Sequence, residues 1–299
     1  MIGLAMSGPH AHMQSWSIQF AVTSALVVTA SVYFRGWLSL RTAFPNLIRG
    51  WHLAAFMSGL ILVWTAIGSP VAALDHQSLT IHMMKHLLLM TVAAPLVLAG
   101  APAFPFVCGL PKLFITKDSP LSSAPARWLE HWLKNPVWCW LAGSAAVIGW
   151  HLPVAFQLGM RSDSVHDLEG MCFFVAGLLF WWPIVQSSPS STRSPRWSMA
   201  LYLFLATLPC DILSAFLVFS NRLVYPFYLS TPHLFSRTAL QDQECAGALM
   251  WVWVTFAYLI PAVAVTVQIL SPRHVQSLGP IGVGRQRVPG EALNGAELR

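Results

Sequence analysis

Long apolar runs separated by short polar segments dominate this chain. Seven runs contain the ~20 mostly apolar residues that a helix needs to cross the hydrocarbon core of a membrane. The runs lie near Trp16–Phe34, Gly50–Gly68, Leu79–Ala99, Pro136–Phe156, Leu168–Gln186, Trp197–Phe219 and Ala246–Leu270. Turn residues such as Ser69–Pro70 and Gly100–Pro102 stand between them. The pattern predicts an all-α polytopic membrane protein with seven transmembrane helices.

The composition supports the same class. The chain has 299 residues, of which 56% are hydrophobic and 9% are charged, whereas a soluble domain carries about 25% charged residues. So few charges would not cover a soluble surface, and a disordered chain needs low hydrophobicity and high charge. We therefore expect an external segment at residues 1–15, one transmembrane domain at 16–270 and a disordered cytoplasmic tail at 271–299, which is rich in Gly, Arg and Pro.

Lysine and arginine alternate between successive polar segments. Summed over alternate segments, 13 of the 17 basic residues fall on one side and 3 on the other, and Lys85 lies inside the third run. Because basic residues collect on the cytoplasmic side, the N-terminus is predicted outside and the C-terminus inside. This bias also accounts for the net charge of +6, so no nucleic-acid partner is expected.

Histidines and acidic residues gather at the predicted outer ends of the helices. His82 and His86 are spaced i, i+4 and therefore share one helix face, which Met83 borders. His166 and Glu169, spaced i, i+3, share a face of the fifth predicted helix. Ionisable groups inside a membrane are costly and commonly functional. These pairs therefore make this end of the predicted bundle the first place to look for a site.

A metal site is the hypothesis that unites these residues. With His151 near the outer end of the fourth run, four imidazoles from three helices can converge: His82, His86, His151 and His166. Imidazole suits Zn, Cu, Fe and Ni, and added methionine or cysteine ligands favour Cu(I). Glu169 and Asp242 are expected to orient imidazoles by accepting hydrogen bonds. No nucleophile–base arrangement or phosphate loop is seen, so we expect no catalytic turnover.

Simpler interpretations stay open for each member. His82 and His86 can be an ordinary hydrogen-bonded pair, and His151 can satisfy a carbonyl freed by Pro153. The acidic residues near His166 can simply favour a helix N-terminus. Lys85 can extend to the interface, or pair with Glu169 or Asp242.

A set of short motifs occurs in a fixed order over residues 50–270. They are His82-Met-Met-Lys-His86 with Ala94-Pro95-Leu96 and Gly100-Ala-Pro102, Trp150-His-Leu-Pro153, Val165-His-Asp-Leu-Glu169, Leu178-Leu-Phe-Trp-Trp-Pro183, Tyr225-Pro-Phe-Tyr228, and Asp242-Gln243 running to Met250-Trp251. With these motifs the sequence resembles the seven-helix CtaG family of cytochrome c oxidase assembly factors, the branch associated with caa-type oxidases.

The resemblance implies a role in maturing cytochrome c oxidase in the bacterial inner (plasma) membrane. The implied partners are oxidase subunits and membrane lipid, with a copper chaperone as a further candidate, and copper is the expected metal. The resemblance implies seven site residues in this chain: His82, His86, His151, His166, Glu169, Asp242 and Gln243. Met83 and Met250 are expected to support them.

This chain departs from the family pattern at two places. The family commonly has His-x-x-x-His in the fifth helix, and Gly170 stands at the second position here. Glu244-Cys-Ala-Gly247 stands where a double glycine is usual, so Cys245 is a candidate replacement ligand.

Two rival functions remain from the residues alone. One is a b-type haem protein, because paired histidines can ligate haem iron. The other is a copper permease, which the scarcity of inward polar groups other than His52 disfavours.

Overall fold

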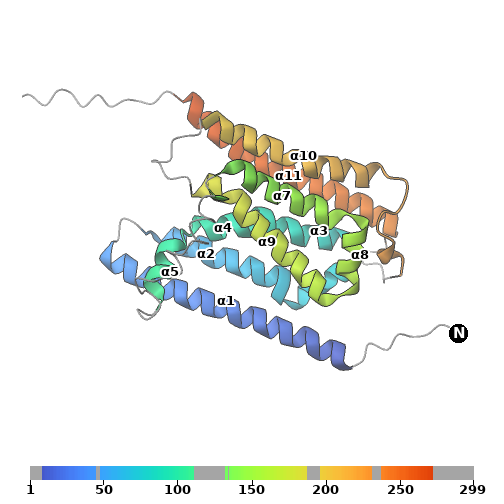
Figure 1. The fold of residues 1–299 in the computed structure, drawn as a ribbon, viewed down its shortest axis with the longest axis horizontal. Helices are drawn as coiled ribbons and strands as arrows, with labels where there is room; N and C mark the ends of the chain where they lie inside the picture. Colours follow the sequence, from blue (N-terminus) through green and yellow to red (C-terminus); the bar gives the residue numbers. More distant parts are fainter. Residues whose placement is uncertain are drawn as a thin grey trace, which may run out of the picture.

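In the computed structural model the protein is a bundle of long, roughly aligned helices (Figure 1). The structure describes residues 9–44, 48–110, 132–133, 135–186, 196–230 and 237–271, without the side chains of 9–19, 71, 73 and 196. Every regular element in these ranges is helical, so the all-α prediction is confirmed.

The helices follow the predicted apolar runs. Their bounds are α1 (Pro9–Ala43), α2 (Gly50–Val63), α3 (Leu79–Leu88), α4 (Ala94–Ala99), α5 (Ala103–Gly109), α7 (Pro136–His151), α8 (Pro153–Arg161), α9 (Asp163–Val185), α10 (Arg196–Phe219) and α11 (Ala239–Leu270). The π-helical turns η1 (Trp64–Gly68) and η3 (Leu89–Ala93) extend α2 and join α3 to α4, and the 3-10 segments are η2 (Pro70–His76) and η6 (Pro226–Leu229).

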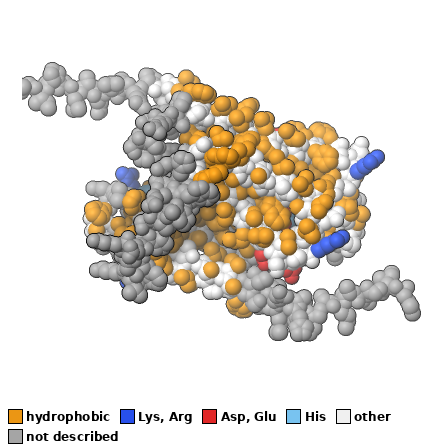
Figure 2. Space-filling model, viewed as in Figure 1, with side chains coloured by type: hydrophobic (Ala, Val, Ile, Leu, Met, Phe, Trp, Pro, Cys, Tyr) orange, Lys and Arg blue, Asp and Glu red, His pale blue; other side chains and the backbone are white. Residues whose placement is uncertain are grey.

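Six of these helical stretches are long and apolar enough to cross a membrane, and the number is seven when the bent pair α7–α8 is counted as one span. The protein is therefore a multi-pass membrane protein. Hydrophobic side chains cover most of the face in Figure 2, with Lys and Arg toward its margins. Among the outward-facing side chains, Val154 is 73% exposed and Ile212 is 71% exposed, which suits contact with lipid tails.

The fourth predicted helix is not continuous. The prediction ran from Pro136 to Phe156, but α7 ends at His151 and α8 begins at Pro153 after a bend of 72°. Leu152 between them has φ −61° and ψ 132°, because a proline ring disfavours the helical conformation in the residue before it.

Helix α1 begins at Pro9, ahead of the predicted start at Trp16. Helices α9 and α11 also begin earlier than the apolar runs indicated, at Asp163 instead of Leu168 and at Ala239 instead of Ala246. Their first turns are polar, and hydropathy alone does not detect such turns. For α11, Thr238 and Gln241 form a capping box that stabilises the start of the helix. As a result, His166, Glu169 and Asp242 all lie within regular helix.

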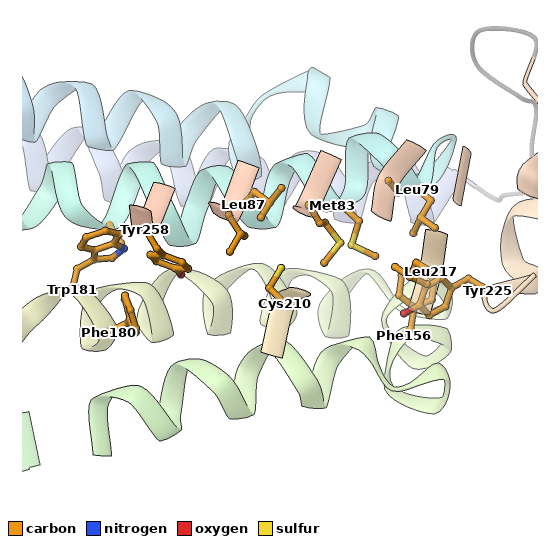
Figure 3. Packing of buried hydrophobic residues seen from close by; sticks show 14 of the residues in the cluster. Leu79, Met83, Leu87, Phe156, Phe180, Trp181, Cys210, Leu217, Tyr225 and Tyr258 are labelled. Atoms are coloured by element: carbon orange, nitrogen blue, oxygen red, sulfur yellow. The ribbon is translucent and has the colours of Figure 1, made fainter. Parts of the chain in front are cut away.

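A large apolar core fills the space between α3, α8, α9, α10 and α11. Figure 3 shows its aromatic members at two ends: Tyr258, Phe180 and Trp181 at one, Phe156 and Tyr225 at the other. Leucine, methionine and cysteine side chains lie between these ends. The polar residues predicted to form a site lie beside the Phe156 end, because His82 is in ring contact with Phe156.

Helix α9 approaches η3 closely at Gly177. A methyl group at this position would lie 2.8 Å from the Met90 carbonyl oxygen and 2.9 Å from Ala94 Cβ. Small residues allow membrane helices to pack backbone to backbone in this way. Gly149 in α7, by contrast, has no atom within 4 Å of an added Cβ.

Gly177→Ala should therefore destabilise the bundle, by about 1–3 kcal/mol for overpacking. Gly149→Ala is the matched control, and it should be neutral or gain up to about 1 kcal/mol from the better helix propensity of alanine. Thermal unfolding of both variants in detergent would measure the difference. An unchanged or raised midpoint for Gly177→Ala would contradict the close approach.

Candidate metal centre

The candidate site lies one to two turns inside the end of the bundle where α3 and α9 begin, at the right of Figure 1. His82 and His86 project from one face of α3, and their ring centroids are 4.4 Å apart. This follows from their spacing, since residues four apart lie one above the other on a helix. Both rings face α9, which supplies His166 and Glu169.

The Glu169 carboxylate lies among three imidazoles. Its Oε1 is 3.5 Å from His82 Nε2 and 3.7 Å from His86 Nε2, and its Oε2 is 3.4 Å from His166 Nδ1. Glu169 is 1% exposed and His82 is fully buried. One ligand atom from each of His82, His86 and Glu169 lies within 4.8 Å of the others. A single ion with ligand distances near 2 Å can bridge such a group.

Several polar atoms of this cluster have no hydrogen-bond partner within the described part of the chain. They are both ring nitrogens of His82 and of His86, Nδ1 of His166 and Oε2 of Glu169. A buried polar atom left unsatisfied costs about 1–3 kcal/mol. A bound cation supplies the missing partner to imidazole lone pairs and a carboxylate together, so these residues fit a metal ion.

A second group of charges borders the first. Lys85 Nζ donates to Asp75 Oδ2 at 2.6 Å and lies 2.6 Å from His166 Nε2, which is itself 2.8 Å from Asp75 Oδ2. Lys85 is buried, so it does not extend to the interface. Its ion-pair partner is Asp75, and not Glu169 or Asp242 as the sequence left open. Its partner Asp75 lies in η2, the short segment before α3, and the Asp75 carbonyl accepts a hydrogen bond from Tyr228 Oη at 2.8 Å.

Asp75 stays ionised in this setting. Burial by itself raises the pKa of a carboxyl group, but the hydrogen bond with His166 and the positive charge of Lys85 outweigh it. Together they hold the pKa of Asp75 well below its usual range. Asp75, His76 and His166 also form a triple whose ligand atoms lie within 4.8 Å of one another.

Asp75 and His76 are not among the site residues predicted from the sequence. One signal in the sequence points to them. Only ten residues, 69–78, connect the second and third predicted spans, so this segment must pass directly over the ends of both helices. An acid followed by a histidine there comes close to the first turns of α3.

His151 faces another neighbour. Its Nδ1 donates to the Val147 carbonyl at 2.7 Å, and its Nε2 lies 3.1 Å from Met83 Sδ. The His86 and His151 ring centroids are 6.4 Å apart. The close ligand group is therefore His82, His86 and Glu169, with His166 beside it and His151 on the adjoining side.

Asp242 and Gln243 support the surrounding backbone. The Asp242 carboxylate accepts hydrogen bonds from Ser78 Oγ, from the Leu79 N–H and from Thr80 Oγ1, and so caps the start of α3. Gln243 accepts from the Val224 N–H at 2.8 Å and donates to the Arg222 carbonyl at 3.2 Å. Both residues hold segments that meet at this end of the bundle.

The remaining sequence-selected positions border the cluster. Met250 lines a cavity that His86 and His151 share. A Cβ at Gly170 would lie 3.8 Å from both Ile67 Cδ1 and Lys85 Cε, at ordinary contact distance. Position 170 therefore lies next to the aliphatic part of the Lys85 side chain.

Comparison with known proteins identifies the family of this chain. A family model described as cytochrome c oxidase caa3 assembly factor matches residues 31–271, which include all the residues of both groups. No curated protein sequence and no solved structure matches the chain.

Lys85→Met should strongly destabilise the protein, because it leaves the Asp75 carboxylate buried without its cation. Breaking a buried ion pair on one side typically costs about 3–5 kcal/mol. The double variant Lys85→Met/Asp75→Asn removes both charges and should recover much of the loss in an unfolding titration in detergent. Arg161→Met, at an exposed position, is the control. Equal instability of the single and double variants would argue against the pair.

Asp242→Ala should lower stability by about 0.5–2 kcal/mol, the usual effect of removing a helix cap, because α3 loses three hydrogen bonds at its start. Glu244→Gln, an exposed neighbour on the same helix, should leave the thermal midpoint unchanged. Amide hydrogen exchange at residues 79–81 would localise the effect. Unaltered protection there in Asp242→Ala would rule out the capping role.

Proposed function

The chain belongs to the cytochrome c oxidase caa3 assembly factor family, and we propose that it assists oxidase maturation by holding a copper ion at His82, His86 and Glu169. In this proposal the protein lies in the bacterial inner (plasma) membrane with this end of the bundle on the outer side. It passes the ion to an oxidase subunit and performs no catalytic turnover. A copper chaperone is the proposed donor of the ion.

The observation that carries the proposal is the set of buried donor atoms without hydrogen-bond partners around Glu169. Two imidazoles and one carboxylate suit borderline metals such as copper and zinc. Three protein ligands leave room for a fourth from an incoming partner, and transfer by ligand exchange needs such an open position. His166, 3.4 Å from Glu169 through Nδ1, can serve as an additional ligand.

The charge of the cluster also favours a cation. Two carboxylates, Asp75 and Glu169, lie beside one ammonium group, that of Lys85. An uncompensated charge is costly inside a membrane. A cation bound beside Glu169 gives this carboxylate a positively charged partner.

A series of imidazoles connects this position with the surface. The His76 side chain is 35% exposed, and its ring centroid is 4.8 Å from that of His166. The His166 centroid is 5.3 Å from that of His82. A metal ion arriving at His76 can therefore move inward by exchanging one ligand at a time, with His166 as the intermediate.

A haem fits this geometry poorly. Two axial histidines must approach a flat macrocycle from opposite faces, whereas His82 and His86 project from the same face of one helix with centroids 4.4 Å apart. The His86 ring is also stacked on Phe173, with a centroid distance of 4.1 Å. Purified protein should accordingly lack a Soret band.

Metal analysis tests the site directly. Full-length protein purified in detergent and loaded with Cu(I) under reducing conditions should lose about one copper per chain in the His82→Ala/His86→Ala variant, because two of three ligands are removed. His52→Ala is the matched control, because His52 lies at the start of α2 and takes no part in the cluster. Its ring stacks on Trp51 and its Nδ1 accepts a hydrogen bond from the Arg49 N–H. Equal copper in the double variant and the wild type would defeat the site assignment.

Complementation tests the role. A strain lacking this protein should assemble little active caa-type oxidase, and the wild-type and His52→Ala proteins should restore it. The His82→Ala/His86→Ala protein should be present in the membrane but fail to restore oxidase activity. Normal oxidase activity in the deletion strain would remove the proposed role, whatever the copper content of the purified protein.

A further inference from the structure

A cavity lies next to the Glu169 cluster, on the side away from Lys85 and Asp75. It has about 40 Å³ of free volume and is lined by residues of α3, α7, α9, α10 and α11. Most of its surface is apolar, but its wall includes the thioethers of Met83, Met90 and Met250, the thiol of Cys210, and the imidazoles of His86 and His151. Soft sulfur donors therefore surround a space that is large enough for an ion.

His151 lines this cavity, and within the described part of the chain no proton donor faces its Nε2. A carbonyl oxygen only accepts, so the 2.7 Å contact with Val147 requires the proton to be on His151 Nδ1. In the neutral imidazole Nε2 then presents a lone pair, and the atom it meets, at 3.1 Å, is Met83 Sδ, itself a weak acceptor. His151 is 7% exposed and Met83 is 1% exposed, so two buried lone-pair donors face each other.

Cys210 supplies a third donor from the opposite wall. It is 6% exposed, and its only polar contact among the described residues is a 3.9 Å approach to Ser214 Oγ. Figure 3 shows the Cys210 and Met83 side chains extending toward each other across the core. One imidazole, one thioether and one thiol on three different helices thus line the same cavity.

We propose that Met83, His151 and Cys210 form a second copper site, specific for Cu(I), within this cavity. Thioether, thiolate and imidazole ligands favour monovalent copper over harder cations. The Cys210 thiol releases its proton to solvent as the copper–sulfur bond forms, so one positive charge leaves as another enters and the net charge of the cavity does not change. No electron transfer is involved.

This site goes beyond the proposed function, which concerns the Glu169 cluster. The two positions lie on adjacent faces of α3, because the consecutive residues His82 and Met83 are separated by about 100° around the helix. His82 faces Glu169 of α9, and Met83 faces His151 of α7. His86 lines the cavity and also contacts Glu169, so it stands between the two sites.

X-ray absorption of the full-length protein loaded with Cu(I) tests the proposal. The wild-type spectrum should contain copper–sulfur scattering, and Met83→Leu and Cys210→Ser should each reduce it. In competition with a Cu(I) chelator, each variant should bind the sulfur-ligated copper at least ~100-fold more weakly than the wild type. Loss of a group that only supports a ligand can already cost this much, and here a ligand itself is removed.

The controls use equivalent residues outside the cavity wall. Met84→Leu changes the neighbouring methionine, which is 43% exposed, and Cys172→Ser changes a partly buried cysteine of α9; both should match the wild type. A wild-type spectrum without copper–sulfur scattering overturns the proposal even if a variant misfolds. Sulfur scattering retained in full by both Met83→Leu and Cys210→Ser overturns it as well.

The failure of this site and the failure of the proposed function are distinguishable. His82→Ala/His86→Ala should lose the copper bound by nitrogen and oxygen and keep the sulfur-ligated copper, and Met83→Leu should show the reverse. If the sulfur scattering disappears in His82→Ala/His86→Ala, then only one site exists and the second site is refuted.

Discussion

This end of the bundle is organised around the burial of one carboxylate, that of Glu169, among imidazoles. A buried carboxylate is costly where partners do not surround it, and here its nearest polar neighbours are imidazole nitrogens of α3 and of α9 itself, at 3.4 to 3.7 Å. Helix α8 closes the fourth side, because a Cβ at Gly159 would lie only 3.0 Å from Glu169 Oε2. The bend at Leu152 brings α8 into this position, so the broken fourth helix encloses the carboxylate.

The segments around the cluster are held by hydrogen bonds from distant parts of the chain. Asp242 of α11 caps α3, Tyr228 Oη donates to the Asp75 carbonyl at 2.8 Å, and Tyr225 Oη donates to the His151 carbonyl at 2.9 Å. Each bond satisfies a backbone group at a helix end or in a connection, where no helical partner is present. The imidazoles therefore project from backbone that these hydrogen bonds hold in place.

Two kinds of donor set meet on α3. The side toward α9 offers nitrogen and oxygen donors, whereas the side toward α7 and α10 offers sulfur in an apolar cavity. The two donor sets are thus separated by the width of one helix. His76, His166 and His82 form a path of closely spaced rings toward the interior.

The sequence by itself determined the class of fold and the end of the bundle that carries polar chemistry. Apolar runs of about 20 residues leave a helix as the only element that satisfies its own backbone in a membrane, and the i, i+4 spacing of His82 and His86 places both on one face. The tertiary structure alone decided which residues meet across helices. Asp75 contacts Lys85 and His166, Asp242 caps α3, and His151 contacts Met83. None of these contacts follows from spacing along the chain. The rotation of each helix about its axis and the bend at Pro153 depend on the packing of all the neighbouring helices. Local spacing specifies contacts within one helix, and only packing specifies contacts between helices.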